Sequence, residues 1–129
     1  MVNNDPVGTG SFSLNRRSDS TVGDYSFCEG NNNISAGKCS HAGGENTIVN
    51  GAFSFGFGEG IKLPYINTCA FGKYNKSDSS ILFAIGSGTD DANRTNGLEL
   101  KSLSNGKCSL SVDRLNTTTI SAANLSLSG

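Results

Sequence analysis

The side chains that could carry chemistry are few and lie far apart along this chain. His41 is the only histidine, and a lone histidine could act as a base, a metal ligand or a pH-sensitive group. No cysteine or carboxylate stands at metal-ligand spacing from it, and no Ser/His/Asp or Cys/His motif can be assembled around it. The sequence therefore predicts no catalytic residue, no cofactor-binding residue and no metal ligand, and the protein is not expected to be an enzyme.

The spacing of the cysteines favours free thiols. Cys28, Cys39, Cys69 and Cys108 are separated by 11, 30 and 39 residues, which leaves no short metal-binding knuckle. Cys28 and Cys69 fall where the repeat described below takes small residues. We expect partly buried thiols that act as small apolar fillers. Disulfides, or a metal-binding or catalytic role, are the alternatives.

A glycine-containing loop carries the most concentrated oxygen ligands. Asp90, Asp91, Asn93 and Asn96 are of the type that calcium prefers, but they lack the spacing and closing glutamate of an EF-hand. We expect turn chemistry here, with Asp and Asn side chains capping backbone amides and Arg94 as an ion-pair partner. Calcium binding is the alternative.

Three further motifs have ordinary explanations. Gly56, Gly58 and Gly60 followed by Lys62 lack the spacing of a phosphate-binding loop, so they are assigned to the repeat. The pair Arg16-Arg17 is interpreted as a solvated strand end. Two tripeptides fit the N-glycosylation pattern and are interpreted as chance matches: Asn75-Lys76-Ser77 and Asn116-Thr117-Thr118.

The composition excludes an ordinary helical domain. Gly, Ser and Asn, which are poor helix formers, make up about 40% of the 129 residues, and tryptophan is absent. The net charge of −1 gives no electrostatic reason to expect nucleic acid or an anionic membrane as partner. No stretch approaches the roughly 18–20 apolar residues of a membrane-spanning helix. The composition therefore predicts either a loosely ordered chain or one whose order comes from repetition and from partner chains.

Glycine recurs with a fixed period. It occupies every seventh position from Gly23 to Gly58, and Gly72 and Gly86 continue the phase at fourteen-residue steps. The unit is therefore about fourteen residues long, starting at positions 10, 23, 37 and 51, with the first unit one residue short and the last about three residues longer through Pro64. The fourth position of each unit is serine: Ser13, Ser26, Ser40 and Ser54.

This period predicts an all-β fold, a parallel β-roll or β-solenoid of about fourteen-residue coils. Heptads of a coiled coil need apolar residues on a helix, and collagen needs glycine at every third position. Each half-unit is expected to give a short strand, such as 25–28 or 52–55, with glycine turning the corner because it adopts positive φ freely. Coils then stack at about 4.8 Å, and stacking supplies the core that one coil lacks.

Alternate residues of the first strand of each unit face opposite sides. One side carries small residues: Ser26, Cys28, Gly30, Ser40, Ala42, Gly44, Ser54, Gly56 and Gly58. The other side carries polar and aromatic residues: Tyr25, Phe27, Glu29, Cys39, His41, Gly43, Phe53, Phe55 and Phe57. Either side could face the interior of the chain. We expect Phe53, Phe55, Phe57 and Phe71 to lie in a core shared between chains.

The chain is divided into four parts. They are an N-terminal arm (1–9), the β-roll repeat region (10–78), a strand and hairpin segment (79–112) and a C-terminal strand or tail (113–129) that could continue into a longer fibre. Strands are expected over 79–86 and 98–103, with a loop at 87–97 between them. Asn105-Gly106 predicts a hairpin that pairs Leu98–Leu103 with Cys108–Val112.

Several segments resemble one known family. The units SFCEG-x4-SAG and SHAGG-x4-IVNG resemble the SHAEG-type repeats of phage tail proteins and of trimeric adhesin heads. The segment CAFGKYN (69–75) resembles "IGKYN" in tail proteins, and FAIGSGTDDANRTNGLEL (83–100) is similar to the "IGNGTDDANRSNAFEV" segment that follows such repeats. The resemblance covers roughly residues 10–104.

The resemblance implies a left-handed parallel β-roll, usually trimeric, in a structural or attachment segment of a phage tail fibre or tail-like particle. Other tail or baseplate proteins and a host cell-surface glycan are the implied partners, with the loops at 59–68 and 87–97 as receptor contacts. The location would be the virion tail, and with Met1 as the native start no signal peptide is visible, which fits synthesis in the host cytoplasm. The alternatives are a fragment of a bacterial trimeric surface adhesin head and a glycan depolymerase with a site between subunits. Around a trimer axis, His41 could form a three-histidine ring.

Overall fold

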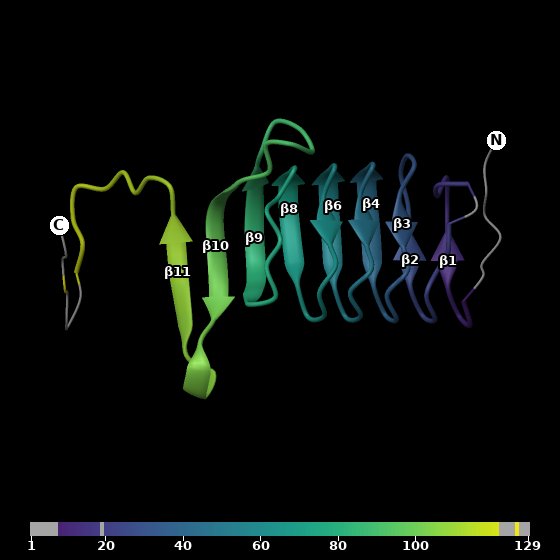
Figure 1. The fold of residues 1–129 in the computed structure, drawn as a ribbon, viewed down its shortest axis with the longest axis horizontal. Helices are drawn as coiled ribbons and strands as arrows, with labels where there is room; N and C mark the ends of the chain where they lie inside the picture. The colour runs from purple at the N-terminus through teal and green to yellow at the C-terminus, as the bar shows by residue number, and fades with distance from the viewer. Residues whose placement is uncertain (1–7, 19, 122–125, 127–129) are drawn as a thin grey trace.

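A computed structural model describes residues 8–18, 20–121 and 126. The described residues form two sheets, shown in Figure 1. The eight-stranded sheet contains, in spatial order, β1 (Phe12–Ser13), β2 (Phe27–Cys28), β4 (His41–Glu45), β6 (Phe55–Glu59), β8 (Cys69–Lys73), β9 (Ile81–Ser87), β10 (Asn96–Ser102) and β11 (Cys108–Val112). The three-stranded sheet contains β3 (Ile34–Ser35), β5 (Ile48–Val49) and β7 (Lys62–Leu63). The arm expected over 1–9 and the tail expected over 113–129 lie partly outside the described residues.

The strands from β1 to β9 in the large sheet pair in parallel, as do those of the small sheet. From β2 onward the register is fourteen residues: Phe27 pairs with His41, His41 with Phe55, and Phe55 with Cys69. The predicted all-β, parallel β-solenoid of fourteen-residue coils is confirmed. In the part of the chain that the structure describes, no helix is long and apolar enough to cross a membrane.

The ends of the repeat differ from the prediction. Phe12 pairs with Phe27, so the first coil is one residue longer than the others, not shorter. Its serine is Ser11, which donates to Gly8 O as Ser26 does to Gly23 O. The unit from position 51 keeps the length of fourteen, because Tyr65 takes the place of glycine. The segment at 59–68, expected as a loop, contains β7.

Glycine forms two columns along the solenoid, and the backbone requires glycine for a different reason in each column. At Gly30, Gly44, Gly58 and Gly72, φ lies between 92° and 150°, and an added Cβ would overlap the carbonyl oxygen of the glycine one coil further on. At Gly8, Gly23, Gly37 and Gly51 an added Cβ would also overlap a carbonyl oxygen one coil further on, which for Gly51 is that of Tyr65, but φ is not in the left-handed region. There the corner is turned by Tyr25, Cys39, Phe53 and Asn67, with φ of 54–57°. The predicted role of positive φ is therefore right for the first column and wrong for the second. The strands accordingly begin at Phe27 and Phe55, two or three residues later than predicted.

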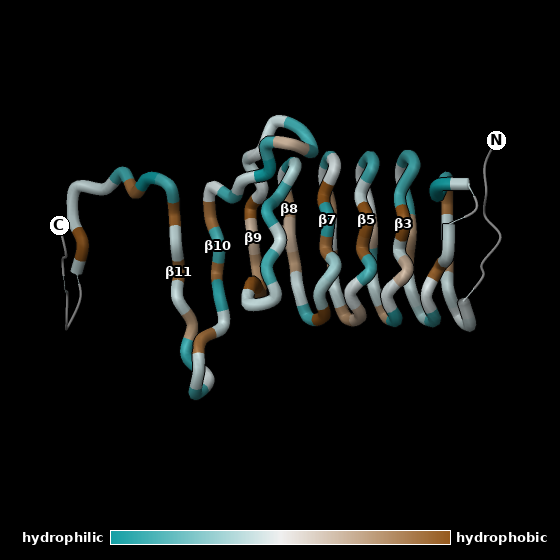
Figure 2. Tube along the Cα trace, viewed as in Figure 1, coloured by the Kyte–Doolittle hydropathy of each residue, from teal (hydrophilic) through white to brown (hydrophobic). Residues whose placement is uncertain are grey.

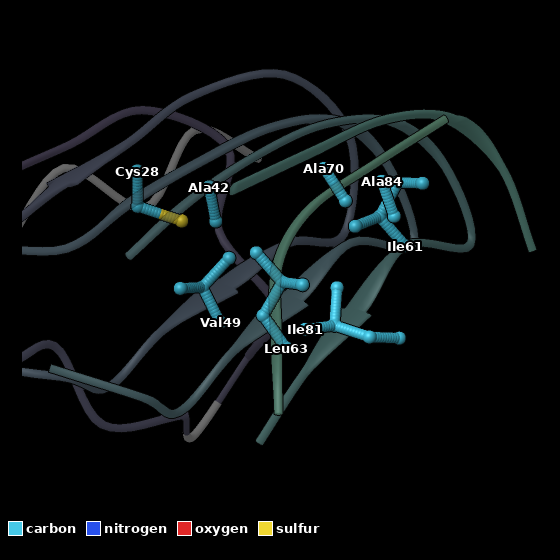
Figure 3. Packing of buried hydrophobic residues seen from close by; sticks show 8 residues of the cluster. All are labelled: Cys28, Ala42, Val49, Ile61, Leu63, Ala70, Ile81 and Ala84. Carbon is cyan, nitrogen blue, oxygen red and sulfur yellow. The ribbon is translucent and has the colours of Figure 1, made fainter. Parts of the chain in front are cut away.

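The small side chains face the interior. Figure 3 shows Cys28, Ala42, Ala70 and Ala84 in one line on one side of the core, facing Val49, Leu63 and Ile81. All seven are at most 4% exposed, and the interior is narrow because the large sheet contributes only small side chains. The aromatic side of the strands therefore faces outward.

The cysteines are all free thiols, as expected, but only Cys28 is fully buried. Burial raises the pKa of its thiol to about 11, which keeps it protonated and suits it to an apolar filler. Cys69 does not occupy a small-residue position, because it pairs with Phe55 on the aromatic side. Cys39 and Cys108 are exposed.

Buried polar side chains replace missing backbone partners at the corners. Asn33 and Asn75 lie three coils apart at one corner and are at most 1% exposed. Each accepts a hydrogen bond from a backbone N–H, of Thr47 and Lys62 respectively, at 2.7 and 2.8 Å. Asn75 also donates to Lys62 O at 3.1 Å. This burial makes Asn75 unsuitable as a glycan acceptor, in agreement with the chance interpretation.

The hairpin prediction is confirmed. β10 and β11 are antiparallel, with Leu98 opposite Val112 and Ser102 opposite Cys108. Asn105 and Gly106 take φ of 63° and 71°, the left-handed conformation that a tight turn of this type requires. β9 pairs in parallel with β8 and antiparallel with β10, so it ends the solenoid and begins the hairpin segment. Figure 2 shows hydrophobic residues in strands such as β3, β5 and β9, and hydrophilic residues at the upper corners.

Candidate functional site

Two rows of mainly apolar residues line the outer surface of the eight-stranded sheet, the first across all eight strands and the second from β4 to β11. The Glu29 carboxylate lies on the same side, against His41. Residues that pair across neighbouring strands point to the same side, so the register defines two outward rows. The first row is Phe12, Phe27, His41, Phe55, Cys69, Phe83, Leu100 and Leu110. The second row is Gly43, Phe57, Phe71, Ile85, Leu98 and Val112. We call these two rows the apolar face.

Much of the apolar face is open to solvent. Phe57 is 43% exposed, Phe71 37% and Leu110 65%. In the first row the Phe12 and Phe27 rings stack, with their centroids 5.0 Å apart. At Cys69, which has no ring, Phe71 of the second row takes over, with its ring centroid 5.6 Å from that of Phe55. Soluble monomers rarely leave apolar patches of this continuity uncovered. Large exposed apolar patches are typical of surfaces that proteins use for binding.

His41 belongs to the first row of the apolar face. Its ring centroid lies 4.9 Å from that of Phe27 and 4.5 Å from that of Phe55, and its Nε2 lies 3.3 Å from Glu29 Oε1. Its side chain is 28% exposed, on the side that a partner chain would cover. Within one chain it is a packed member of the aromatic row. The three-histidine ring needs three chains and stays a prediction.

A second surface lies on the other side of the molecule. The outer side of β5 and β7 and the loop at 88–95 enclose a groove of about 600 Å3, which we call the polar groove. Its lining is Ile48, Asn50, Lys62, Leu63, Pro64, Lys76, Ser77, Asp91 and Arg94. Because the interior of the solenoid separates the two sheets, the polar groove and the apolar face point in opposite directions.

One carboxylate holds the loop at 88–95 over the small sheet. Asp91 Oδ1 lies 2.7 Å from Lys62 Nζ and 2.5 Å from Arg94 Nη2. Arg94 also donates to Asn75 O at 3.2 Å, and its guanidinium carbon lies 5.5 Å from the centre of the Tyr74 ring. The hydrogen bonds from Lys62 and Arg94 lower the pKa of Asp91 to about 2. Asp91 is therefore ionised near neutral pH.

The predicted turn chemistry of this loop is confirmed. Asp90 Oδ1 accepts from the backbone N–H groups of Ala92 and Asn93 at 2.9 and 3.0 Å, and Arg94 pairs with Asp91 as expected. Asn96 belongs to a different contact, because its side chain bonds both backbone groups of Lys76 at 2.9 Å. Among the described residues, no group of three or more His, Cys, Asp and Glu side chains could hold a metal ion.

Comparison of the chain with family models, curated proteins and solved structures gave no match.

Two features of these surfaces were missed from the sequence. Lys62 and Lys76 are fourteen residues apart, and that spacing alone would have placed them on adjacent coils. Leu98, Leu100, Leu110 and Val112 alternate in the hairpin, and the alternation would have extended the aromatic side of the strands into β10 and β11. Both features could have been predicted from the regular spacing of residues along the chain, and neither corresponds to a short local motif.

The Asp91 contacts predict an acid-induced release of the loop at 88–95. A carboxyl whose pKa is lowered on folding contributes stability that is complete above its ordinary pKa and is lost as the pH falls through the folded value. We expect the loop to stay closed down to about pH 4 and to open around pH 2. NMR shifts of the Arg94 side chain and the Thr95 amide, followed during an acid titration, would report the opening.

Asp91→Asn should open the loop at neutral pH, whereas Asp113→Asn, at an exposed aspartate of the chain outside this network, should leave it closed. A transition of the Arg94 signal that is the same in wild type and Asp91→Asn would contradict the assignment.

Proposed function

We propose that the protein is a structural and attachment segment of a phage tail fibre or a related tail-like particle, in which three copies pack through the apolar face. The observation that carries this proposal is the continuity of that face. Both rows of the apolar face continue onto the hairpin strands β10 and β11, which lie beyond the solenoid core. Beyond the solenoid these apolar side chains cannot contribute to the chain's own core, so they are suited to contact with another chain.

The thin interior supplies a second argument. The large sheet gives the core mainly Ala and Cys side chains, while Phe57, Phe71 and Leu110 are left in solvent. Covering them would add stabilisation at about 25 cal/mol per Å2 of apolar surface. The faces of three chains can meet around one axis, and the resemblance of the repeats to trimeric tail and adhesin proteins favours three copies over two.

The proposed attachment role depends on the surfaces that would stay exposed when three copies pack through the apolar face. The small sheet, its corners and the loop at 88–95 all point away from the apolar face. Loops on a rigid scaffold can vary without disturbing the core. Three equivalent surfaces on one rod would bind a repetitive cell-surface glycan with avidity, while the ends of the rod would contact other tail or baseplate proteins in the virion.

A binding experiment tests the attachment role. Purified bacterial capsular and O-antigen polysaccharides would be immobilised, and retention of the protein measured by surface plasmon resonance. We expect at least one polysaccharide to retain the protein, with retention about 100-fold weaker for a monomeric variant of the apolar face. Equal retention of the trimer and the monomer, or no retention by any polysaccharide, would contradict the proposed attachment function.

A further inference from the structure

We propose that the polar groove binds a sugar carrying a negative charge, as a carboxylate or a phosphate. This inference rests on the proposed attachment function and specifies where and what the protein binds. Four charged side chains line the groove: Lys62, Lys76, Arg94 and Asp91. Three of them are cationic, so the groove has an excess of positive charge in a protein whose net charge is −1.

The three cationic side chains differ in their ion-pair partners. Asp91 is shared by Lys62 and Arg94, so this carboxylate neutralises only one of two positive charges. In the described part of the chain no carboxylate lies within ion-pair distance of Lys76 Nζ. Glu99 is near enough to Lys76 for the ammonium charge to help lower the Glu99 pKa. An incoming anion would therefore find one ammonium group that holds no ion pair and a second charge only half compensated. Arg94, at 16% side-chain exposure, is fixed against Tyr74 and needs little further ordering to bind.

The remaining lining fits the rest of a sugar ring. Ile48 and Pro64 form an apolar part of the wall, and Asn50 and Ser77 add hydrogen-bonding groups. A pyranose has one face of C–H groups and a rim of hydroxyls, so it needs both kinds of contact. A volume of about 600 Å3 is within the range of small-molecule sites and accommodates one or two sugar units.

The position of the groove suits an attachment site. Lys62 and Lys76 lie on the outer side of adjacent coils, away from the apolar face, so a trimer would carry three open grooves. The cations come from two different parts of the chain, the repeat and the loop at 88–95, and Asp91 joins them. Weak binding at each groove would add up on a polymer that repeats the charged sugar.

The test uses free monosaccharides and the full chain. Galacturonate, galactose 6-phosphate and galactose would be titrated separately into 15N-labelled protein, with amide shifts around the groove as the readout. We expect millimolar binding of at least one anionic sugar, at least tenfold tighter than galactose, and weaker at 500 mM than at 50 mM salt. The two anionic ligands distinguish a carboxylate site from a phosphate site.

Three variants define the result further. Lys76→Gln should weaken the binding of the anionic sugar by about tenfold, because it removes the ammonium group that holds no ion pair. Lys107→Gln, at an exposed lysine beside the hairpin turn, is the matched control and should bind as wild type. Asp91→Asn should also weaken binding, because the opened loop at 88–95 would carry Arg94 away from the groove.

Binding of galactose as tight as that of both anionic sugars, or full binding by Lys76→Gln, would overturn the inference. Polysaccharide retention by the trimer without monosaccharide binding in the groove would overturn only this inference and leave the attachment function standing. Failure of retention as well would overturn both.

Discussion

Replacing Gly44 by alanine is expected to abolish the folded state or to lower its free energy of unfolding by about 4 kcal/mol. Gly44 lies in the middle of a column of four glycines, with a φ of 92° that L residues rarely adopt. An added methyl group would overlap the carbonyl oxygen of Gly58 on the next coil. That oxygen belongs to the backbone of a paired strand, so it cannot move without breaking the parallel register.

Gly43→Ala is the matched control. The neighbouring glycine has no positive φ, and its added Cβ would meet the Phe57 ring, 2.5 Å away, at the open face of the sheet. A side chain can move aside there, so we expect a loss of about 1 kcal/mol or less. Urea unfolding followed by far-UV circular dichroism would compare the two variants. Equal midpoints for Gly44→Ala and wild type would contradict the close-stacked column.

The second large effect concerns the apolar face. Replacing Phe57 and Phe71 together by glutamate is expected to convert the proposed trimer into folded monomers. The two residues pair on β6 and β8 in the middle of the second row, and both are exposed within one chain. Burying an unpaired carboxylate at an interface costs several kcal/mol, and losing an aromatic anchor costs about 2 kcal/mol more. Since neither residue belongs to the interior, the solenoid itself should persist.

Solution mass and circular dichroism together would check this result. Ile66→Glu provides the control, because Ile66 is 64% exposed at a corner outside both rows. We expect this variant to keep the mass of the wild type. A Phe57→Glu/Phe71→Glu variant that stays trimeric would show that the chains meet through another surface.

The architecture could be predicted from the sequence because glycine recurs once per coil at positions where the backbone leaves no room for a side chain. Gly44 and Gly58 recur because their coils touch, so their spacing is the coil length. The hairpin at Asn105-Gly106 was likewise predictable, since two left-handed residues define its turn. Local chemistry of this kind is visible without knowledge of the fold.

The phase of the repeat was harder to predict. Tyr25 and Phe53 look like strand residues, yet they turn corners in the left-handed conformation, because stacking against the adjacent coil outweighs their preference for extended backbone. Tyr65 stands at the position where earlier coils have glycine. The start of this coil was therefore not recognised from the sequence, and the segment containing Pro64 was interpreted as an insertion. In these places tertiary stacking overrides the preference of the single residue.

The surfaces depend on contacts between distant coils. Which side of the strands faces inward was left open by the alternation alone, and it is decided by Val49, Ile61 and Leu63 filling the space opposite Gly56. The polar groove combines Lys62 with Asp91 and Arg94 across about thirty residues, through a loop whose course no repeat describes. Such a site follows only from the folded arrangement.

The association of three chains is most directly tested by the solution mass of the unaltered protein, measured by light scattering behind size exclusion at several concentrations. Three chains of 13.4 kDa would give about 40 kDa, held down to low micromolar concentration. That is the result expected if the apolar face is the contact between copies. A folded protein of 13.4 kDa at every concentration would contradict it, because the apolar face would then stay in solvent.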